Sequence, residues 1–167
     1  MLILPILISF FTTFLLLPSW IKRAHTAGLV GKDLHKLGGK EIAESGGMNV
    51  VAGFSLGLLT YVAINTFLFK TTTHFIEMFA LLSTLLLISF IAFTDDILGW
   101  KIGLRRRTRI MLVIFASIPL MAINAGKSEI SFPFFGTIDA GILYPIFLIP
   151  LGIVGATTTF NFLAGYN

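Results

Sequence analysis

Asp95 and Asp96 are the residues best suited to chemistry, because they stand side by side where a long apolar run ends. Ionised groups beside hydrocarbon are costly, and they are usually retained for a cation, a proton path or a substrate. A carboxylate pair offers the hard oxygen ligands that suit magnesium and phosphate chemistry. The alternative is a solvated pair where the chain leaves a membrane. An isoprenoid-diphosphate site would need a further aspartate three residues on, and Gly99 stands there instead.

A cluster of arginines follows the acidic pair and comprises Arg105, Arg106, Arg107 and Arg109. Arginines beside membrane helices anchor the topology and attract anionic lipid. The guanidinium fork also binds phosphate oxygens in bidentate fashion. Arg105 comes nine residues after Asp96. We therefore expect a short turn between them to bring the Arg105 side chain back over the two carboxylates.

Two more polar segments carry candidate groups. The first spans 31–47 and contains Lys36, Glu44 and several glycines that would let backbone amides approach a nucleotide. It matches no P-loop or dinucleotide fingerprint, and a flexible connector is the alternative. The second is the tail over 157–167, with Asn161 and Asn167. Amide oxygens can join a magnesium shell, whereas helix–helix hydrogen bonding is the alternative.

The composition indicates the elements that position these groups. Of 167 residues, 56% are hydrophobic and 12% charged, which excludes an ordinary soluble domain. The absence of cysteine excludes disulfides and thiolate metal sites. We expect an all-α, polytopic transmembrane bundle of about five helices that forms a single membrane domain over 1–167. Its first helix is retained rather than cleaved as a signal peptide. The apolar runs predict five helices, over 2–21, 48–69, 75–94, 110–124 and 141–162.

Details of these helices give further predictions. The fourth is short for a full span. Pro119, Pro145 and Pro150 lie inside the last two helices, where neighbours must satisfy the freed carbonyls. The small residues Gly53 and Gly57 predict a helix-packing face.

Basic residues set the expected orientation. The net charge is +4, and the lysines and arginines gather in 22–47 and 95–109, so they indicate topology rather than nucleic-acid binding. The positive-inside rule makes both segments cytoplasmic loops, with the N-terminus outside and the C-terminus in the cytoplasm. The three polar segments then meet on one cytoplasmic face.

Together these segments resemble the polyprenyl-phosphate N-acetylhexosamine-1-phosphate transferases of glycosyltransferase family 4, closest to the dolichyl-phosphate N-acetylglucosaminephosphotransferase branch. The first loop resembles that branch from Gly31 to Gly47, and 94–99 resembles the family's Asp-Asp signature. The sequence Asn-Phe-Leu-Ala-Gly-Tyr-Asn at 161–167 resembles the start of the Asn-rich motif, which normally continues Gly-Leu-Glu-Ala-Gly.

The resemblance implies a reaction. A lipid phosphate oxygen attacks the sugar-linked phosphorus of UDP-N-acetylglucosamine, UMP leaves, and a lipid-diphosphate sugar forms. It implies Mg²⁺, for which Mn²⁺ could substitute, held by Asn161 with Asp95 and Asp96. The two aspartates would be catalytic and would organise the metal or the lipid phosphate. The implied substrate-binding residues are Lys36, Glu44, Arg105 and Asn167. Thr158 stands where many relatives carry another asparagine.

The resemblance also implies partners and a place. The partners are a UDP-sugar, a polyprenyl or dolichyl phosphate and the membrane, with no nucleic acid. The location is the cell membrane in an archaeon or bacterium, or the endoplasmic reticulum membrane in a eukaryote, with the active face cytoplasmic. Family members carry about twice as many helices, so we expect a fragment or split product, inactive without its missing half or an oligomeric partner. The alternatives are a non-catalytic membrane remnant and a small helical transporter or assembly protein.

Overall fold

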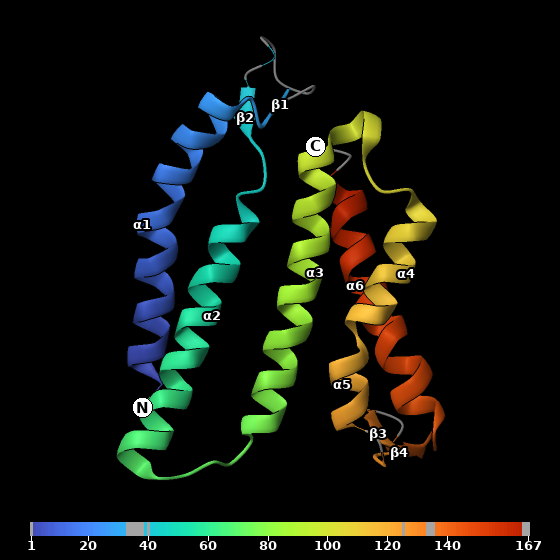
Figure 1. Ribbon diagram of the computed structural model, residues 1–167. Coiled ribbons are helices and arrows are strands. Elements are labelled where there is room, and N and C mark those ends of the chain that lie inside the picture. Colours follow the sequence, from blue (N-terminus) through green and yellow to red (C-terminus); the bar gives the residue numbers. More distant parts are fainter. Residues whose placement is uncertain (1, 33–38, 40, 125, 133–135, 165–167) are drawn as a thin grey trace. The chain divides into compact units, whose positions relative to one another are not determined.

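The computed structural model describes residues 2–32, 39, 41–124, 126–132 and 136–164. Their contacts form two compact units, one of residues 1–78 and 92–103 and the other of residues 79–91 and 104–166. The helices, labelled in Figure 1, are α1 (Ile3–Ala27), α2 (Gly47–Ile64), α3 (Phe75–Ile102), α4 (Arg106–Ala116), α5 (Ile118–Ile123) and α6 (Ile149–Ala164). π-Helical turns continue α2 over Asn65–Phe69 and precede α6 over Tyr144–Leu148. Short strands are β1 (Val30–Lys32), β2 (Glu41–Ala43), β3 (Glu129–Phe132) and β4 (Gly136–Asp139).

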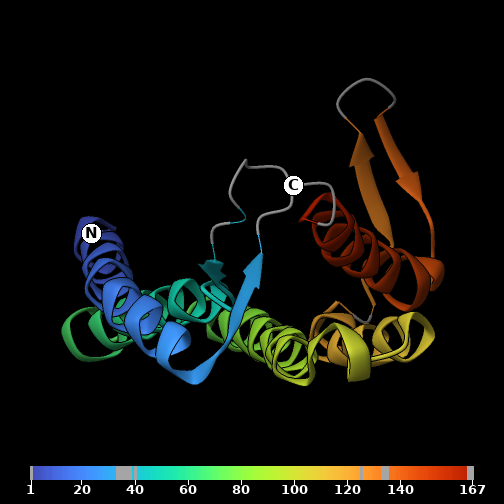
Figure 2. The ribbon, with the colours of Figure 1, turned by 90° about the horizontal axis from the view of Figure 1, so that it is seen from above.

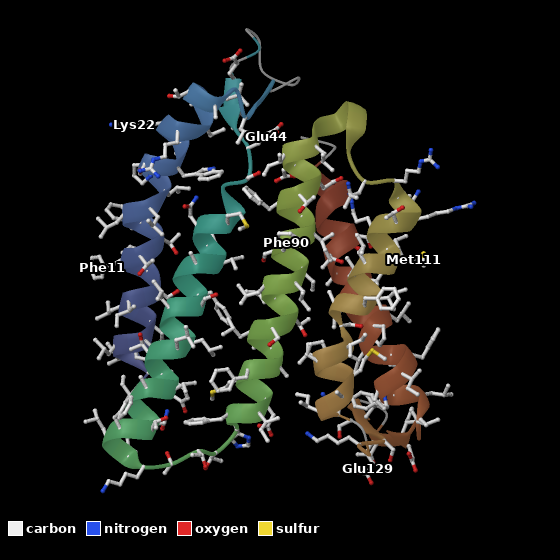
Figure 3. All side chains as sticks on the ribbon, viewed as in Figure 1. Phe11, Lys22, Glu44, Phe90, Met111 and Glu129 are labelled. Carbon is white, nitrogen blue, oxygen red and sulfur yellow. The ribbon has the colours of Figure 1, made fainter. Side chains whose placement is uncertain are left out.

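Three helices of the described chain are long and apolar enough to cross a membrane: Ile3–Ala27, Gly47–Phe69 and Phe75–Leu98. They confirm the first three predicted helices. Large apolar side chains cover their outer surfaces. Phe11 is 52% exposed and points away from α2 in Figure 3, and Phe14 is 61% exposed. Such surfaces are unfavourable in water and match lipid, so the chain is an integral membrane protein.

The predicted fourth helix is divided. α4 ends at Ala116 and α5 begins at Ile118, with fully buried Ser117 between them. The Ser117 hydroxyl donates to the Ile114 carbonyl at 2.6 Å, and Pro119 lies in the first turn of α5. Proline is tolerated there because the first amides of a helix have no intrahelical acceptor. Pro119, predicted as a kink inside one helix over 110–124, thus stands at the start of a second helix.

The predicted fifth helix begins with the π-helical turn and continues as α6. Pro145 lies in the first turn of the π-helical segment. Pro150 is the second residue of α6, two positions after that segment ends, and cannot donate an amide to the preceding turn. Widened π turns occur where the regular ladder is interrupted in this way. α6 packs against α4 within its unit, where Val113 and Ala116 are each 3% exposed.

α1 and α2 lie side by side and make the principal helix–helix contact of the first unit (Figure 1). Gly53 and Gly57 of α2 are buried on the face that meets α1. A Cβ atom on Gly53 would lie 2.7 Å from the main-chain oxygen of Ser9. The predicted helix-packing face is thus confirmed.

Two antiparallel hairpins were not predicted. β1 pairs with β2, placing Gly31 opposite Ile42, and β3 pairs with β4, placing Glu129 opposite Asp139. Both appear as paired arrows in Figure 2. The first hairpin stands in the segment predicted as a loop over 22–47, whose opening residues also belong to α1.

α3 continues to Ile102, eight residues beyond the predicted end at Thr94. The start of the predicted loop over 95–109 is therefore helical, and the prediction that Asp95 and Asp96 follow the end of the helix was wrong. A helix does not have to end where it leaves the membrane, because its main-chain hydrogen bonds can continue into the polar region.

Candidate active site

A short hydrogen bond joins two residues 51 positions apart in the first unit. The Ser45 hydroxyl donates to Oδ2 of Asp96 at 2.7 Å. A hydroxyl bonded to a carboxylate is charge-assisted and stronger than a neutral pair. The bond links the segment before α2 to the acidic pair on α3, so the first loop and the Asp-Asp signature meet as the sequence predicted.

Ser45 adopts a backbone conformation that is unusual for its residue type. Its φ is +57°, in the left-handed region. For a residue with a Cβ atom this conformation costs about 1–2 kcal/mol. Its carbonyl accepts the Met48 amide at 3.2 Å, so Ser45 also begins the hydrogen bonding of α2. Strained residues persist where the surroundings fix them, and they cluster at functional sites.

Trp20 of α1 fixes the residue before Ser45. Its indole Nε1 donates to the Glu44 carbonyl at 2.9 Å. The indole also packs against Phe93 of α3, with ring centroids 6.2 Å apart and planes inclined by 57°. One side chain thus contacts the 44–45 segment and the helix of Asp96, one turn before that aspartate.

Glu44 lies between the first hairpin and α2, and its side chain is exposed (Figure 3). Its amide donates to the Leu29 carbonyl at 3.0 Å, extending the pairing of β1 with β2. A Cβ atom on Gly31 would lie 2.7 Å from Glu44 Oε1. The carboxylate therefore rests directly over the Gly31 backbone, a position that the missing side chain permits.

Asp95 and Asp96 are adjacent in a helix, so they do not face the same way. Successive helical residues differ by about 100° around the axis. Asp96 is exposed and bonded to Ser45, whereas Asp95 is half-buried. The two carboxylates therefore point in different directions and do not act together as one bidentate ligand. This favours different roles for Asp95 and Asp96.

The remaining predicted site residues lie elsewhere. Arg105 belongs to the second unit, where it is the exposed N-cap of α4 and its carbonyl accepts the Arg109 amide at 3.0 Å. That it folds over the acidic pair stays a prediction. Asn161 lies in α6, but its side chain is outside the described part. Lys36 and Asn167 lie outside the described residues.

The oxygen donors of the candidate site fit a magnesium ion that is bound together with a phosphate substrate. Within the described residues, no three histidine, aspartate or glutamate side chains gather to hold a metal ion. In phosphate-transfer sites, however, Mg²⁺ is typically bound through one or two carboxylates, waters and the substrate's own phosphates. The hard oxygens of Asp95 and Asp96 fit that pattern, and Ser45 occupies only one oxygen of Asp96.

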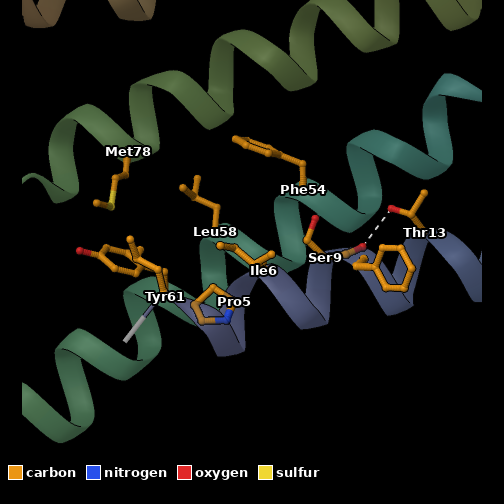
Figure 4. Close-up of a pocket in the computed structure, with 11 residues that line it drawn as sticks. Pro5, Ile6, Ser9, Thr13, Phe54, Leu58, Tyr61 and Met78 are labelled. Atoms are coloured by element: carbon orange, nitrogen blue, oxygen red, sulfur yellow. Dashed lines mark hydrogen bonds between the residues drawn. The ribbon is translucent and has the colours of Figure 1, made fainter.

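A separate apolar groove of about 660 Å³ runs along the first half of α1 and the middle and second half of α2 (Figure 4). It is lined by Pro5, Ile6, Phe54, Leu58, Tyr61 and Met78 among others. Thr13 at its edge bonds the Ser9 carbonyl at 3.0 Å. None of the described residues that line it is an aspartate, glutamate, histidine, lysine or arginine, and Thr13 is about 10 Å along α1 from Trp20. It is therefore distinct from the candidate site.

Residues 78–167, more than half of the chain, match the model of glycosyl transferase family 4. The chain belongs to glycosyl transferase family 4. The family resemblance predicted from the first loop, the acidic pair and the tail is thereby confirmed, and the matched segment contains both Asp95 and Asp96.

Curated proteins are similar to this family 4 chain over nearly its whole length. A putative UDP-N-acetylglucosamine–dolichyl-phosphate N-acetylglucosaminephosphotransferase of Saccharolobus solfataricus is 37% identical over 165 residues, covering 99% of this chain and 48% of the relative. A protein with the same description from Sulfolobus acidocaldarius is 32% identical, with the same coverage. The UDP-N-acetylglucosamine–dolichyl-phosphate N-acetylglucosaminephosphotransferase of Dictyostelium discoideum is 33% identical, covering 93% of this chain and 41% of its own length. The chain spans about half the length of the curated relatives it matches.

Proposed function

We propose that this chain forms part of an enzyme that transfers N-acetylglucosamine 1-phosphate from UDP-N-acetylglucosamine to a dolichyl-type polyprenyl phosphate. The observation that carries the proposal is the contact between Ser45 of the first loop and Asp96 of the Asp-Asp signature. Relatives of 32–37% identity that align with nearly the whole chain bear names describing this reaction.

The reaction balances without a redox partner. An oxygen of the lipid phosphate forms a bond to the sugar-bearing phosphorus of the nucleotide-sugar, the bond from that phosphorus to the bridging oxygen breaks, and UMP departs. A phosphate monoester has a second pKa near 6, so the attacking group is largely ionised at neutral pH. The protein must then hold anions in line and offset the developing charge rather than supply a strong base.

The residues of this chain divide that work. Asp96, fixed by Ser45, would orient the bound cation or, through it, the acceptor phosphate. Asp95 would act from a different direction around α3. Glu44, exposed at the end of the first hairpin, would contact the nucleotide-sugar, with Lys36 and Asn167 as further contacts. Arg105 would neutralise phosphate oxygens.

Magnesium would be held by Asp95, Asp96 and Asn161 together with the substrate diphosphate, and Mn²⁺ would substitute for it. When bound, it would neutralise charge on the diphosphate. We propose further that the site faces the cytoplasm, as the basic residues of 22–47 and 95–109 indicate. Because the chain spans about half the length of its relatives, residues 1–167 expressed alone are expected to form no product.

The test uses the intact protein, expressed from its complete reading frame and purified in detergent. It is supplied with radiolabelled UDP-N-acetylglucosamine and dolichyl phosphate, and solvent-extractable lipid-linked sugar is measured with magnesium and after chelation. We expect product that disappears on chelation and returns with Mg²⁺ or Mn²⁺. Asp95→Asn and Asp96→Asn should each lower the rate by about a hundredfold or more.

Glu129→Gln is the matched control, because Glu129 is an exposed carboxylate on the β3–β4 hairpin (Figure 3). It should leave the rate unchanged. Full activity in Asp95→Asn and Asp96→Asn would refute the site, and an intact protein that binds neither substrate would favour a non-catalytic remnant.

A further inference from the structure

We propose that Ser45 is a positioning residue for Asp96, and that Trp20 holds Ser45 in place. The inference rests on the proposed function for its catalytic consequence, although the hydrogen bond itself can be tested independently. The Ser45 hydroxyl donates to Asp96 Oδ2 at 2.7 Å. A carboxylate that is hydrogen-bonded through one oxygen cannot rotate freely. The hydrogen bond therefore also fixes the direction in which its second oxygen points.

The backbone of Ser45 explains how a flexible hydroxyl is aimed. The left-handed φ of +57° turns the chain sharply between Glu44 and the start of α2. Glycine would adopt this conformation more readily, yet the position carries a hydroxyl. The strained backbone together with the specific polar contact indicates that serine is retained here for its hydroxyl, because glycine would suit the turn better.

The neighbouring bonds fix Ser45 from both sides. On one side, Glu44 donates its amide to Leu29 and accepts the Trp20 indole. On the other, the Ser45 carbonyl accepts the Met48 amide of α2. The serine is therefore held by the hairpin, by α1 and by α2, while its hydroxyl reaches α3.

This arrangement couples two functions. The same two-residue segment carries the exposed carboxylate of Glu44 and the hydroxyl that orients Asp96. A shift of the first loop would move both together. Loss of the Ser45 hydroxyl should therefore impair the catalytic step more than it impairs nucleotide-sugar binding.

The experiment compares Ser45→Gly with Ser45→Ala in the intact protein. Glycine removes the hydroxyl and relieves the strain, whereas alanine removes the hydroxyl and retains the strain. If Ser45 positions Asp96, both variants lower kcat by about tenfold to a hundredfold with KM for UDP-N-acetylglucosamine nearly unchanged. If the residue matters only for the turn, Ser45→Gly keeps wild-type kcat, and the proposal is overturned.

Two further variants sharpen the comparison. Trp20→Phe keeps an aromatic ring beside Phe93 and removes the indole donor, so kcat should fall by about two- to tenfold. Ser83→Ala is the matched control, because the Ser83 hydroxyl donates to the Phe79 carbonyl of its own helix at 2.7 Å. It should leave kcat and KM at wild-type values.

An infrared measurement separates this proposal from the proposed function. In protein labelled with carboxyl-¹³C aspartate, the Asp96 carboxylate band is identified by its loss in Asp96→Asn. Ser45→Gly should shift that band, and Glu129→Gln should not. An unshifted band would overturn the positioning role even in an active enzyme. If the band shifts but the protein has no transferase activity, the hydrogen bond between Ser45 and Asp96 is supported and the proposed function is refuted.

Discussion

A Cβ atom on Gly57 of α2 would lie 2.8 Å from the main-chain oxygen of Pro5 in α1 and 2.9 Å from the Ser9 Cβ atom. Only the absence of a side chain allows α1 and α2 this close approach. The obstructing atom at Pro5 belongs to the backbone and cannot move away as a flexible side chain would. The contact thus depends on glycine for packing rather than for backbone freedom.

Gly57→Ala should therefore separate the two helices and destabilise the protein by about 1–3 kcal/mol, as overpacking does in other tightly packed sites. Gly155→Ala is the matched control, because a Cβ atom there meets nothing within 4 Å and Gly155 also lies in a helix. Thermal unfolding in detergent should show a lower midpoint for Gly57→Ala alone. Equal midpoints in the two variants would contradict the assigned contact.

Gly31→Ala should behave in the opposite way. The atom it would meet is the carboxylate end of Glu44, which can swing aside, so the change in unfolding free energy should stay within about 0.5 kcal/mol. Displacing Glu44 should, however, raise KM for UDP-N-acetylglucosamine several-fold if Glu44 contacts that substrate. Gly47→Ala, whose new Cβ atom meets nothing within 4 Å, serves as the control. A stable variant with unchanged KM would remove Glu44 from the substrate site.

The long apolar runs made the first three helices predictable, because about 20 apolar residues are what a membrane span requires. The end of α3 was missed for the same reason. Hydropathy marks the edge of the membrane, whereas Asp95 to Ile102 continue the helix without needing apolar side chains. The β1 and β2 strands were missed because three residues are too few to show a period of two.

The chemistry of the site was predictable from residue types, but its geometry was not. Nothing local connects Ser45 to Asp96, since their bond depends on packing between segments 51 residues apart. The left-handed conformation of Ser45 was also hidden, because a serine beside two glycines indicates a turn without saying which residue bears it. Trp20 looked like part of an apolar helix, and its indole bond to Glu44 appears only in the folded chain.

Acid should loosen the turn after β4. The Gly141 amide donates to Asp139 Oδ1 at 2.9 Å, and this bond, with a second from Ser128, lowers the pKa of Asp139 from its ordinary value of 3.8. A lowered pKa in the folded state means that the ionised form stabilises the turn above the unfolded pKa. That contribution is lost as the pH falls below about 3.8 through the folded value.

Amide NMR or hydrogen exchange at Gly141 should therefore report a transition below pH 3.8. Asp139→Asn keeps an acceptor oxygen but removes the titrating group, so the Gly141 signal should lose this pH dependence. A transition that persists unchanged in Asp139→Asn would assign it to another group.

Single cysteines should report the orientation of the spans, because residues 1–167 contain none. The positive-inside rule puts Lys22 and Arg107 in the cytoplasm and Lys70 and Lys127 on the opposite face. An impermeant maleimide should therefore label Lys70→Cys and Lys127→Cys in intact cells, and Lys22→Cys and Arg107→Cys only after permeabilisation. α3 begins five residues after Lys70 and carries Asp96 near its other end. Labelling of Lys70→Cys and Arg107→Cys from the same side would mean that α3 does not cross the bilayer, and the cytoplasmic site built on Asp96 would fail with it.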